Sequence, residues 1–323
     1  TMKSQIVACL AVLMVAGTTS ANEAAPGPAD AIVESIDDTE LRMLLEDVLE
    51  RNPKIVALEA RIAAAVPRTT AGRKLPDPTV EVTAFVLPPE TRVGPQRFAA
   101  RLSQRLPGGG KRDISETAAD LDRQALTAEL QALRLALVTD ARRLMVEIGY
   151  LDEAQRVLAD DHATLAHFEE LARARYASGA GLQMDAIQLQ TEMTRLEARR
   201  AELDERRAGV AADINRLRDR PGASIECSPE PPSRAVELEW PRLRSIALAS
   251  RPELDADEAR IRRSASMTEL AAKDRSPDFS VGLTYAYVDK RTDVDVPNNG
   301  RDVFGISGGI TIPLWKTATN AKV

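Results

Sequence analysis

One long stretch without helix-breaking residues constrains this chain more than any other feature. Residues 113–176 contain no proline and a single glycine, Gly149. They are rich in Ala, Leu, Glu, Arg and Gln, which are strong helix formers. At about 1.5 Å per residue such a helix would run roughly 95 Å. Because this length exceeds the width of a globular domain, we expect the helices to pack side by side in a rod.

Apolar residues in this stretch follow the spacing of a coiled-coil seam, with steps of three or four residues or their sum. They are Leu126, Leu130, Leu133, Leu137, Leu144, Ile148, Leu151, Leu158 and Leu165. The pattern resumes at Leu189, Met193, Leu196, Leu203, Val210, Ile214 and Leu217. The sequence therefore predicts a long antiparallel helical hairpin over residues 113–218.

The two predicted helices are separated by a short glycine-containing segment near residues 177–182. Glycine accepts the left-handed backbone that ends helices, and connections between helices are short. Taken alone, this segment predicts a turn and nothing more. The residues that form it or flank it are Arg175, Tyr176, Ser178, Gly179, Leu182 and Asp185.

The N-terminus has the pattern of a secretory signal over residues 1–21. Lys3 precedes an apolar run, and Thr19-Ser20-Ala21 is a small-residue cleavage site. The apolar run of about eleven residues is too short to span a bilayer as a helix. Cys9 lies too early in that run for a lipid anchor, so Cys227 would be the one mature cysteine and no internal disulfide is expected. Residues 22–37 are interpreted as a flexible leader.

The rest of the chain is organised as two copies of one pattern. In the first repeat, residues 38–218, helices interrupted at Asn52-Pro53 precede two alternating strands, 79–87 and 97–106, and then the long hairpin. An equatorial linker is expected over 219–240. The second repeat, 241–323, has a helix over 243–273 that is broken at Arg251-Pro252, followed by strands 279–288 and 303–313.

Matching local sequences indicate an internal duplication. Glu258-Ala259-Arg260-Ile261 echoes Glu59-Ala60-Arg61-Ile62, and Pro277-Asp278 echoes Pro76-Asp77. Ile312-Pro313 ends the last strand as Leu106-Pro107 ends its counterpart. A second long hairpin would then follow, so the second repeat is expected to be truncated at Val323.

The four strands have the length and alternation of membrane-crossing β-strands. A soluble antiparallel sheet gives the same alternation, and the predicted export favours the membrane. Four strands cannot close a barrel, so several chains must share one. Interfacial aromatic residues are available at Phe98, Tyr285, Tyr287, Phe304 and Trp315.

Composition and motifs give no indication of catalysis. A net charge of −6 and interleaved Arg and Glu indicate no nucleic-acid partner. His162 and His167 lie five residues apart, which does not place them for shared metal ligation, and Met184 and Met193 fit the helical seam better than a copper site. Gly108, Gly109 and Gly110 precede a helix without a phosphate-loop signature, so they predict a bend instead. We expect no enzyme activity, no metal site and no cofactor.

In their order, these motifs resemble the TolC-like outer-membrane efflux proteins. They are Asn52-Pro53, residues 71–78 with Leu75-Pro76-Asp77-Pro78, residues 103–112 with Gly108-Gly109-Gly110-Lys111-Arg112, and residues 175–190. The resemblance covers about residues 40–323 and implies a mainly α chain with a membrane β part. It implies long coiled-coil hairpins and four transmembrane strands per chain, which three chains assemble into a trimeric barrel and helical tunnel.

The resemblance also implies partners and sites. The chain would be a homotrimer in outer-membrane lipid with its helices in the periplasm, working with a periplasmic adaptor (a membrane fusion protein) and an inner-membrane efflux pump. The turn with Arg175, Tyr176, Ser178, Gly179, Leu182 and Asp185 would contact the adaptor. Pro107, Gly108, Gly109, Gly110 and Pro313 would form the bend from barrel to tunnel.

The substrate class stays open at this point. The sequences of residues 75–81 and 108–112 look most like those of the CzcC-like branch, which serves heavy-metal pumps. This resemblance implies heavy-metal cations as the substrate, while drugs and proteins remain open as alternatives. The competing interpretation is a soluble periplasmic coiled-coil scaffold or adaptor. It differs in a simple observable, because a scaffold stays in the soluble periplasm and a barrel fractionates with the outer membrane.

Overall fold

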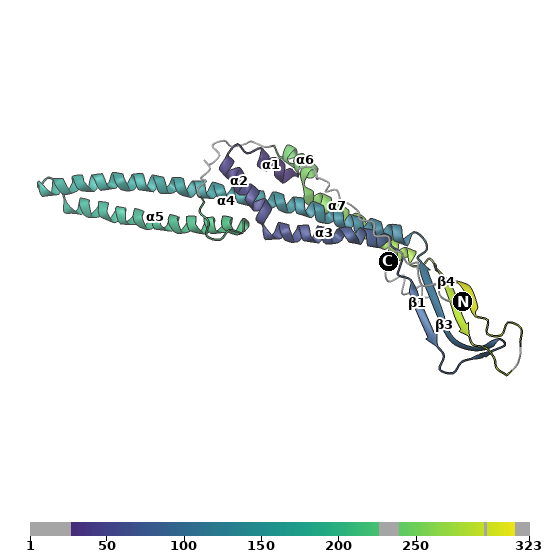
Figure 1. Ribbon diagram of the computed structural model, residues 1–323. Coiled ribbons are helices and arrows are strands. Elements are labelled where there is room, and N and C mark those ends of the chain that lie inside the picture. Colours follow the sequence, from purple (N-terminus) through teal and green to yellow (C-terminus); the bar gives the residue numbers. More distant parts are fainter. Residues whose placement is uncertain (1–26, 226–238, 294–295, 314–323) are drawn as a thin grey trace.

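The computed structural model describes residues 27–225, 239–293 and 296–313. A rod of helices continues at one end into a small antiparallel sheet (Figure 1). In chain order the elements are α1 (Pro28–Glu34), α2 (Thr39–Arg51), α3 (Pro53–Arg73), β1 (Thr79–Ala84), β2 (Glu90–Thr91), β3 (Gly94–Leu106), α4 (Lys111–Ala177), α5 (Gln183–Leu217), α6 (Trp240–Ser250), α7 (Pro252–Lys273), β4 (Asp278–Val288) and β5 (Val303–Thr311). The long antiparallel hairpin and the four main strands expected from the sequence are confirmed.

The helix α4 forms the spine of the rod. It runs over 67 residues, with α5 packed along its distal half and α3 and α7 along the half nearer the sheet (Figure 1). The predicted seam is most buried near the middle, at Ile148 and Leu151 of α4 and Ile214 of α5. Toward the distal end Leu158, Leu165 and Leu189 are half-buried, because two helices alone cover only one stripe of each other.

The junction between α2 and α3 is held by Asn52. Its side-chain oxygen accepts a hydrogen bond from Lys54 N at 3.0 Å, which caps α3, and its Nδ2 donates to Leu217 O at 2.8 Å. Asparagine is a favoured cap and proline a favoured first helical residue, so Asn52-Pro53 specifies a new helix start. Because Leu217 ends α5, this one side chain also ties the helix junction to the base of the hairpin.

The expected flexible leader over 22–37 is wrong for residues 28–34, which form α1. Ala29 and Val33 are buried against the core, and the Asp30 carboxylate forms an ion pair with Arg134 of α4 at 3.0 Å. Asp30 also accepts a hydrogen bond from Gly27 N at 3.0 Å. A seven-residue helix is marginal alone and is stabilised here by packing, which composition does not reveal. The predicted signal, residues 22–26 and most of the linker lie outside the described residues.

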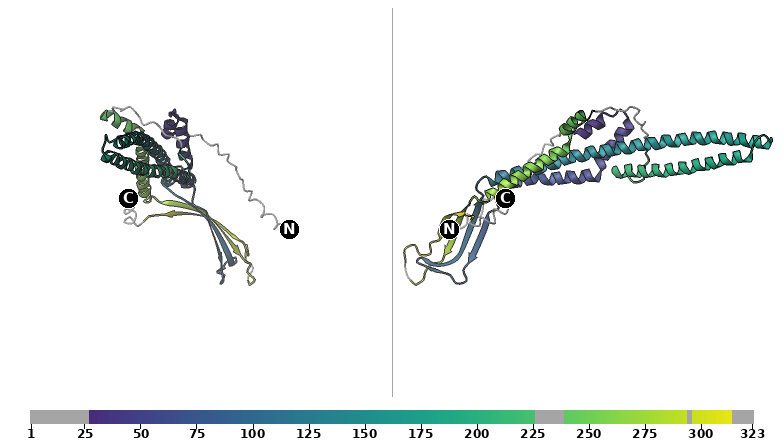
Figure 2. Two further views of the ribbon diagram at one scale, coloured as in Figure 1. Left: turned by 90° about the vertical axis from the view of Figure 1, so that its left-hand side faces the viewer. Right: turned by 180° about the vertical axis from the view of Figure 1, so that it is seen from behind.

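The four main strands form one sheet in the order β1-β3-β4-β5, with every pair antiparallel and the short β2 paired to β3. β1 is shorter than the predicted strand 79–87, and β3 is longer than 97–106. Figure 2 shows the sheet twisting away from the axis of the helical rod. Within the part of the chain that the structure describes, β1 and β5 are its two free edges.

The strand registers support the internal duplication. Asp77 aligns with Asp278 at an offset of 201 residues, and Leu106 with Ile312 at an offset of 206. In the first hairpin Thr79 lies opposite Ser103. The same offsets convert this pair to Ser280 and Gly309, which lie opposite each other in the second hairpin. Both hairpins therefore have the same register.

Candidate functional site

The turn at the distal end of the rod is a tight helix cap. Ala180 N donates to Arg175 O at 2.9 Å and Gly179 N donates to Tyr176 O at 3.0 Å, while Gly179 has a φ of +70°. This is the pattern of a Schellman-type ending, in which a glycine in the left-handed region lets the last carbonyls find partners. The Ser178 hydroxyl donates to Arg175 O at 2.9 Å. The helix therefore ends at a defined point, and the chain reverses within five residues.

All six residues predicted for this tip lie together at the end farthest from the sheet and are solvent-exposed in the single chain. Apolar side chains are prominent among them, with Tyr176 at 51% and Leu182 at 69% relative exposure. Met184 and Ile187 of α5 and Phe168 and Leu171 of α4 are also exposed nearby. Arg175 and Asp185 add one charge of each sign, so the tip exposes apolar and charged side chains together.

Below the tip, polar pairs hold the two helices of the hairpin together. Gln190 Nε2 donates to Glu169 at 2.8 Å, and the Arg206 guanidinium reaches Glu147 at 2.6 Å. Asp152 and Arg207 form a further ion pair across the hairpin, next to the Glu147–Arg206 pair. These contacts fix the offset between α4 and α5, and with it the position of the turn.

At the opposite end of α4, the Asp278 carboxylate joins the two repeats. Its Oδ1 accepts from Lys111 Nζ at 2.9 Å and from Gly108 N at 3.0 Å, and its Oδ2 accepts from Arg105 at 2.6 Å. Burial alone would raise the pKa of this carboxyl, but the hydrogen bonds from Lys111, Gly108 and Arg105 outweigh burial and lower its pKa to about 2. Asp278 thus stays ionised, at the helical end of β4.

The glycines predicted to form a bend lie between β3 and α4, and the backbone requires glycine there for two reasons. A Cβ on Gly108 would lie 2.3 Å from Pro277 O, so this position requires the close approach that glycine allows. Gly109 and Gly110 have φ values of +68° and +74°. Pro107 directly follows β3, and Pro313 lies two residues beyond β5, at the corresponding end of the second hairpin. Trp315 lies outside the described residues.

The two faces of the sheet differ in chemistry. One face pairs apolar residues across strands, as in Val80–Leu102, Leu102–Leu283 and Leu283–Ile306. The other pairs small and polar residues, as in Thr79–Ser103, Ser103–Gly282 and Gly282–Ser307. Phe98 packs against Tyr285 and Tyr287 on the apolar face, with ring centroids 5.9 and 6.1 Å apart.

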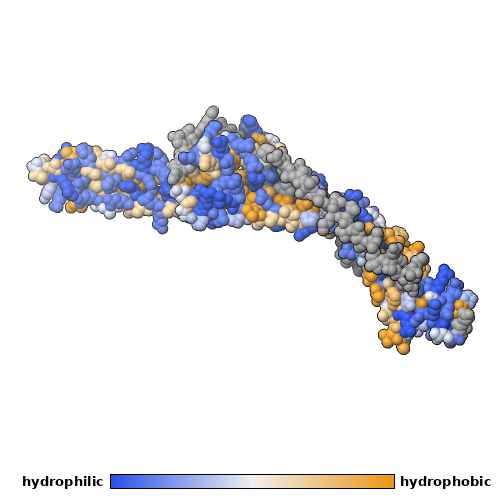
Figure 3. All heavy atoms as spheres, viewed as in Figure 1, coloured by the Kyte–Doolittle hydropathy of each residue, from blue (hydrophilic) through white to orange (hydrophobic). Residues whose placement is uncertain are grey.

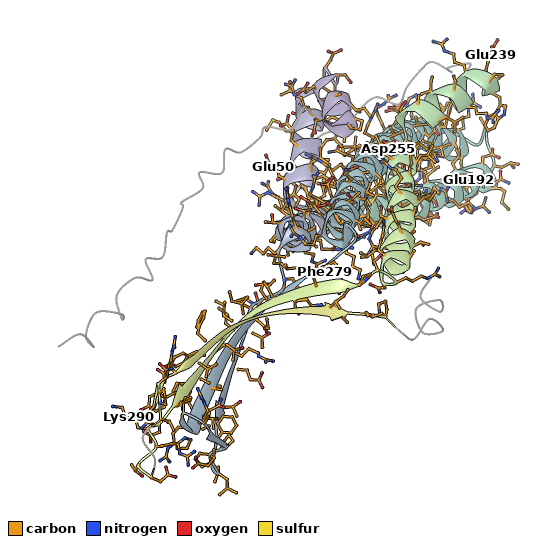
Figure 4. The ribbon with its side chains drawn as sticks, turned by 90° about the vertical axis from the view of Figure 1, so that its right-hand side faces the viewer. Glu50, Glu192, Glu239, Asp255, Phe279 and Lys290 are labelled. Carbon is orange, nitrogen blue, oxygen red and sulfur yellow. The ribbon has the colours of Figure 1, made fainter. Side chains whose placement is uncertain are left out.

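The apolar face is exposed in the single chain. Val80, Val82, Phe304, Ile306 and Ile310 all have more than half of their side-chain surface accessible. In the space-filling view apolar residues cover part of the sheet, mainly toward the helices, while the outer end of the sheet is hydrophilic (Figure 3). Figure 4 shows Phe279 where β4 leaves the helices and Lys290 at the far end of the sheet, so the apolar strand positions lie between them. Such a large exposed patch marks an interaction surface.

The two histidines of the chain, His162 and His167, lie in separate surroundings. His162 Nε2 lies 3.3 Å from Glu197 across the hairpin, and the His167 ring lies beside Phe168 on the same helix. Among the described residues there is no group of three or more His, Cys, Asp or Glu side chains placed to hold a metal ion. Within the same ranges, none of the helices has the length and hydropathy of a membrane span.

Two contacts at these sites were not predicted from the sequence. The Asp278 cluster joins residues more than 160 positions apart, and only the echo of Pro76-Asp77 in Pro277-Asp278 pointed to it. The bond between Asn52 and Leu217 likewise joins distant parts of the chain, although Asn52-Pro53 is itself a recognisable helix start.

The chain was compared in sequence and in fold with known proteins, and only solved structures match it. No protein-family model matches the chain, and no curated protein matches it in sequence. Among solved structures, the outer-membrane channel OprN superposes with a TM-score of 0.70 over 88% of this chain and 67% of its own, at 16% identity. The outer-membrane protein VceC of Vibrio cholerae gives 0.66 over 88% and 73%, at 21% identity. The Campylobacter jejuni channel CmeC gives 0.67 over 95% and 69%, at 13% identity.

The chain spans about two thirds of the length of these channels. The likeness extends over both the helical rod and the sheet, since it covers 88–95% of this chain. The protein therefore has the fold of the TolC-like outer-membrane channels.

Proposed function

We propose that this protein is the outer-membrane channel of a tripartite efflux system, a passive conduit rather than an enzyme. Three copies place their sheets in the outer membrane and their helices in the periplasm. An inner-membrane pump and a periplasmic adaptor deliver the substrate. Heavy-metal cations are one candidate substrate class, on the strength of the sequence resemblance alone.

The observation that carries this proposal is the two-faced open sheet at the end of the rod. Its apolar face suits lipid, its small and polar face suits a water-filled lumen, and its two free edges require further strands. If the protein were instead a soluble periplasmic scaffold, this apolar face would be left exposed to water. The fold shared with OprN, VceC and CmeC supports the same choice.

The adaptor is proposed to contact the tip formed by Arg175, Tyr176, Ser178, Gly179, Leu182 and Asp185. Support comes from their joint exposure at the end opposite the sheet, where a periplasmic partner could reach them. The exposed side chains of Tyr176 and Leu182 support the same proposal, because exposed apolar and aromatic residues are typical of protein interfaces. Pro107, the three glycines and Pro313 are proposed as the bend from barrel to tunnel.

Deletion of the gene tests the proposal. Intracellular accumulation of the pump's substrate should rise in the deletion strain and return to the parental level when the full-length protein is restored. Unchanged accumulation while the partner pump is expressed would contradict the channel role. Recovery of the protein in the soluble periplasmic fraction would favour the scaffold instead.

A further inference from the structure

The internal repeat of this chain contains a template for its contact with another copy. Within one chain the sheet joins the repeats through β3 of the first and β4 of the second. Under the duplication, β3 corresponds to β5 and β4 corresponds to β1. The contact that repeats this junction is therefore β5 of one chain against β1 of the next, and these are the two free edges.

The offsets that relate the repeats convert the internal register into an intermolecular one. Arg101 lies opposite Thr284 in the β3–β4 pair. Adding the offset of 206 residues to Arg101 gives Ser307, and removing the offset of 201 from Thr284 gives Thr83. In the same way the pair of Gln104 and Val281 becomes Ile310 and Val80.

We propose that Ser307 of one chain lies opposite Thr83 of the next, with Ile310 opposite Val80, in an antiparallel ladder between copies. The inference rests on the proposed function, because it assumes that several copies share one sheet in the outer membrane. It goes beyond that function by specifying which residues of the two edge strands lie opposite each other.

The chemistry of the two edges agrees with this register. On the apolar face, Val80, Val82 and Ala84 lie beside Ile310, Gly308 and Ile306, in that order. On the polar face, Thr79 lies beside Thr311 and Thr83 beside Ser307. A slip of one residue would turn every side chain of one strand to the wrong face. The side chains of Val80, Val82, Ile306 and Ile310 are between 55% and 82% exposed in the single chain, so this contact covers apolar surface that the chain leaves open.

Disulfide cross-linking tests the register. Full-length chains that carry Cys227→Ser and either Thr83→Cys or Ser307→Cys are co-expressed, and isolated outer membranes are treated with a mild oxidant. Within one chain β1 and β5 are three strand spacings apart, roughly 14 Å, which a disulfide cannot bridge. A two-chain band on a non-reducing gel therefore reports contact between copies.

The matched control replaces Ser307→Cys with Gly305→Cys. Gly305 is on the same face two residues away, and a Cβ there meets no atom within 4 Å. The proposed register predicts a two-chain band for the Thr83 and Ser307 pair and its loss for the Thr83 and Gly305 pair. A band only in the control, or in neither pair with the protein in the outer membrane, would overturn the register and leave the channel proposal standing. Protein found only in the soluble periplasm would overturn both.

Discussion

The Lys111 ammonium lies 2.9 Å from the Asp278 carboxylate, and this contact fastens the first turn of the long helix to the first strand of the second repeat. Lys111 is 13% and Asp278 8% exposed, so water screens the pair weakly. Gly108 and Arg105 complete the cluster. This cluster joins the sheet to the helical rod at the start of α4.

Replacing Asp278→Asn should destabilise the folded chain, because it leaves Lys111 without its closest anionic partner. A pKa of about 2, against an ordinary value of 3.8, corresponds to about 2 kcal/mol of stabilisation at neutral pH. Thermal unfolding of the protein in detergent should show the loss. Asp274→Asn is the matched control, since Asp274 lies 4.0 Å from Lys111 and is 43% exposed.

The same carboxylate should give the protein a specific acid sensitivity. The pKa of Asp278 is lower in the folded state, so its contribution to stability is complete above about pH 4 and is lost as the pH falls toward about 2. The difference in unfolding free energy between the parent and Asp278→Asn should shrink across that window. A difference that stays constant down to about pH 2 would show that the carboxylate is not held in this way.

Gly108→Ala should disturb the junction more than Gly110→Asn. The new methyl group would lie 2.3 Å from Pro277 O, a clash that costs on the order of 2 kcal/mol unless the backbone shifts. Gly110 has a φ of +74° with open space around it, and asparagine tolerates that conformation. Equal unfolding temperatures for the two variants would contradict the proposed role of Gly108.

Gly179→Val should weaken efflux, while Gly179→Asn should preserve it. The φ of +70° costs a β-branched residue about 1–2 kcal/mol, and nothing else crowds the position. Substrate accumulation in cells and the amount of assembled protein in the outer membrane would be measured together. Full efflux with valine at this position would place the adaptor contact elsewhere.

Val82→Lys should block insertion into the outer membrane, and Thr83→Lys should be tolerated. The two positions are adjacent but lie on opposite faces of β1. A lysine facing lipid near the membrane centre costs about 2–4 kcal/mol, whereas one facing a wet lumen costs little. Western blots of outer-membrane fractions would compare the two variants. Similar levels of both would argue against a lipid-facing Val82.

The parts predicted from the sequence were those with local signals. The long helices follow from leucine spacing and the strands from alternation, because side-chain periodicity is set by neighbours along the chain. The helix α1 was missed because Ala29, Val33 and Asp30 act through contacts with the core and with Arg134 of α4. The Asp278 cluster was missed because its partners Arg105 and Lys111 are distant in sequence. Periodicity placed the elements but not the contacts that join them.

The accessibility of successive residues along β4 tests directly whether the sheet spans the outer membrane. Single cysteines at Ser280, Val281, Leu283 and Thr284 would be exposed to a water-soluble maleimide in intact outer membranes, in the Cys227→Ser background. A membrane-spanning sheet predicts labelling at 280 and 284, on the polar face, and protection at 281 and 283, on the apolar face, until detergent removes the lipid. Equal labelling at all four positions before detergent is added would contradict a membrane-spanning sheet.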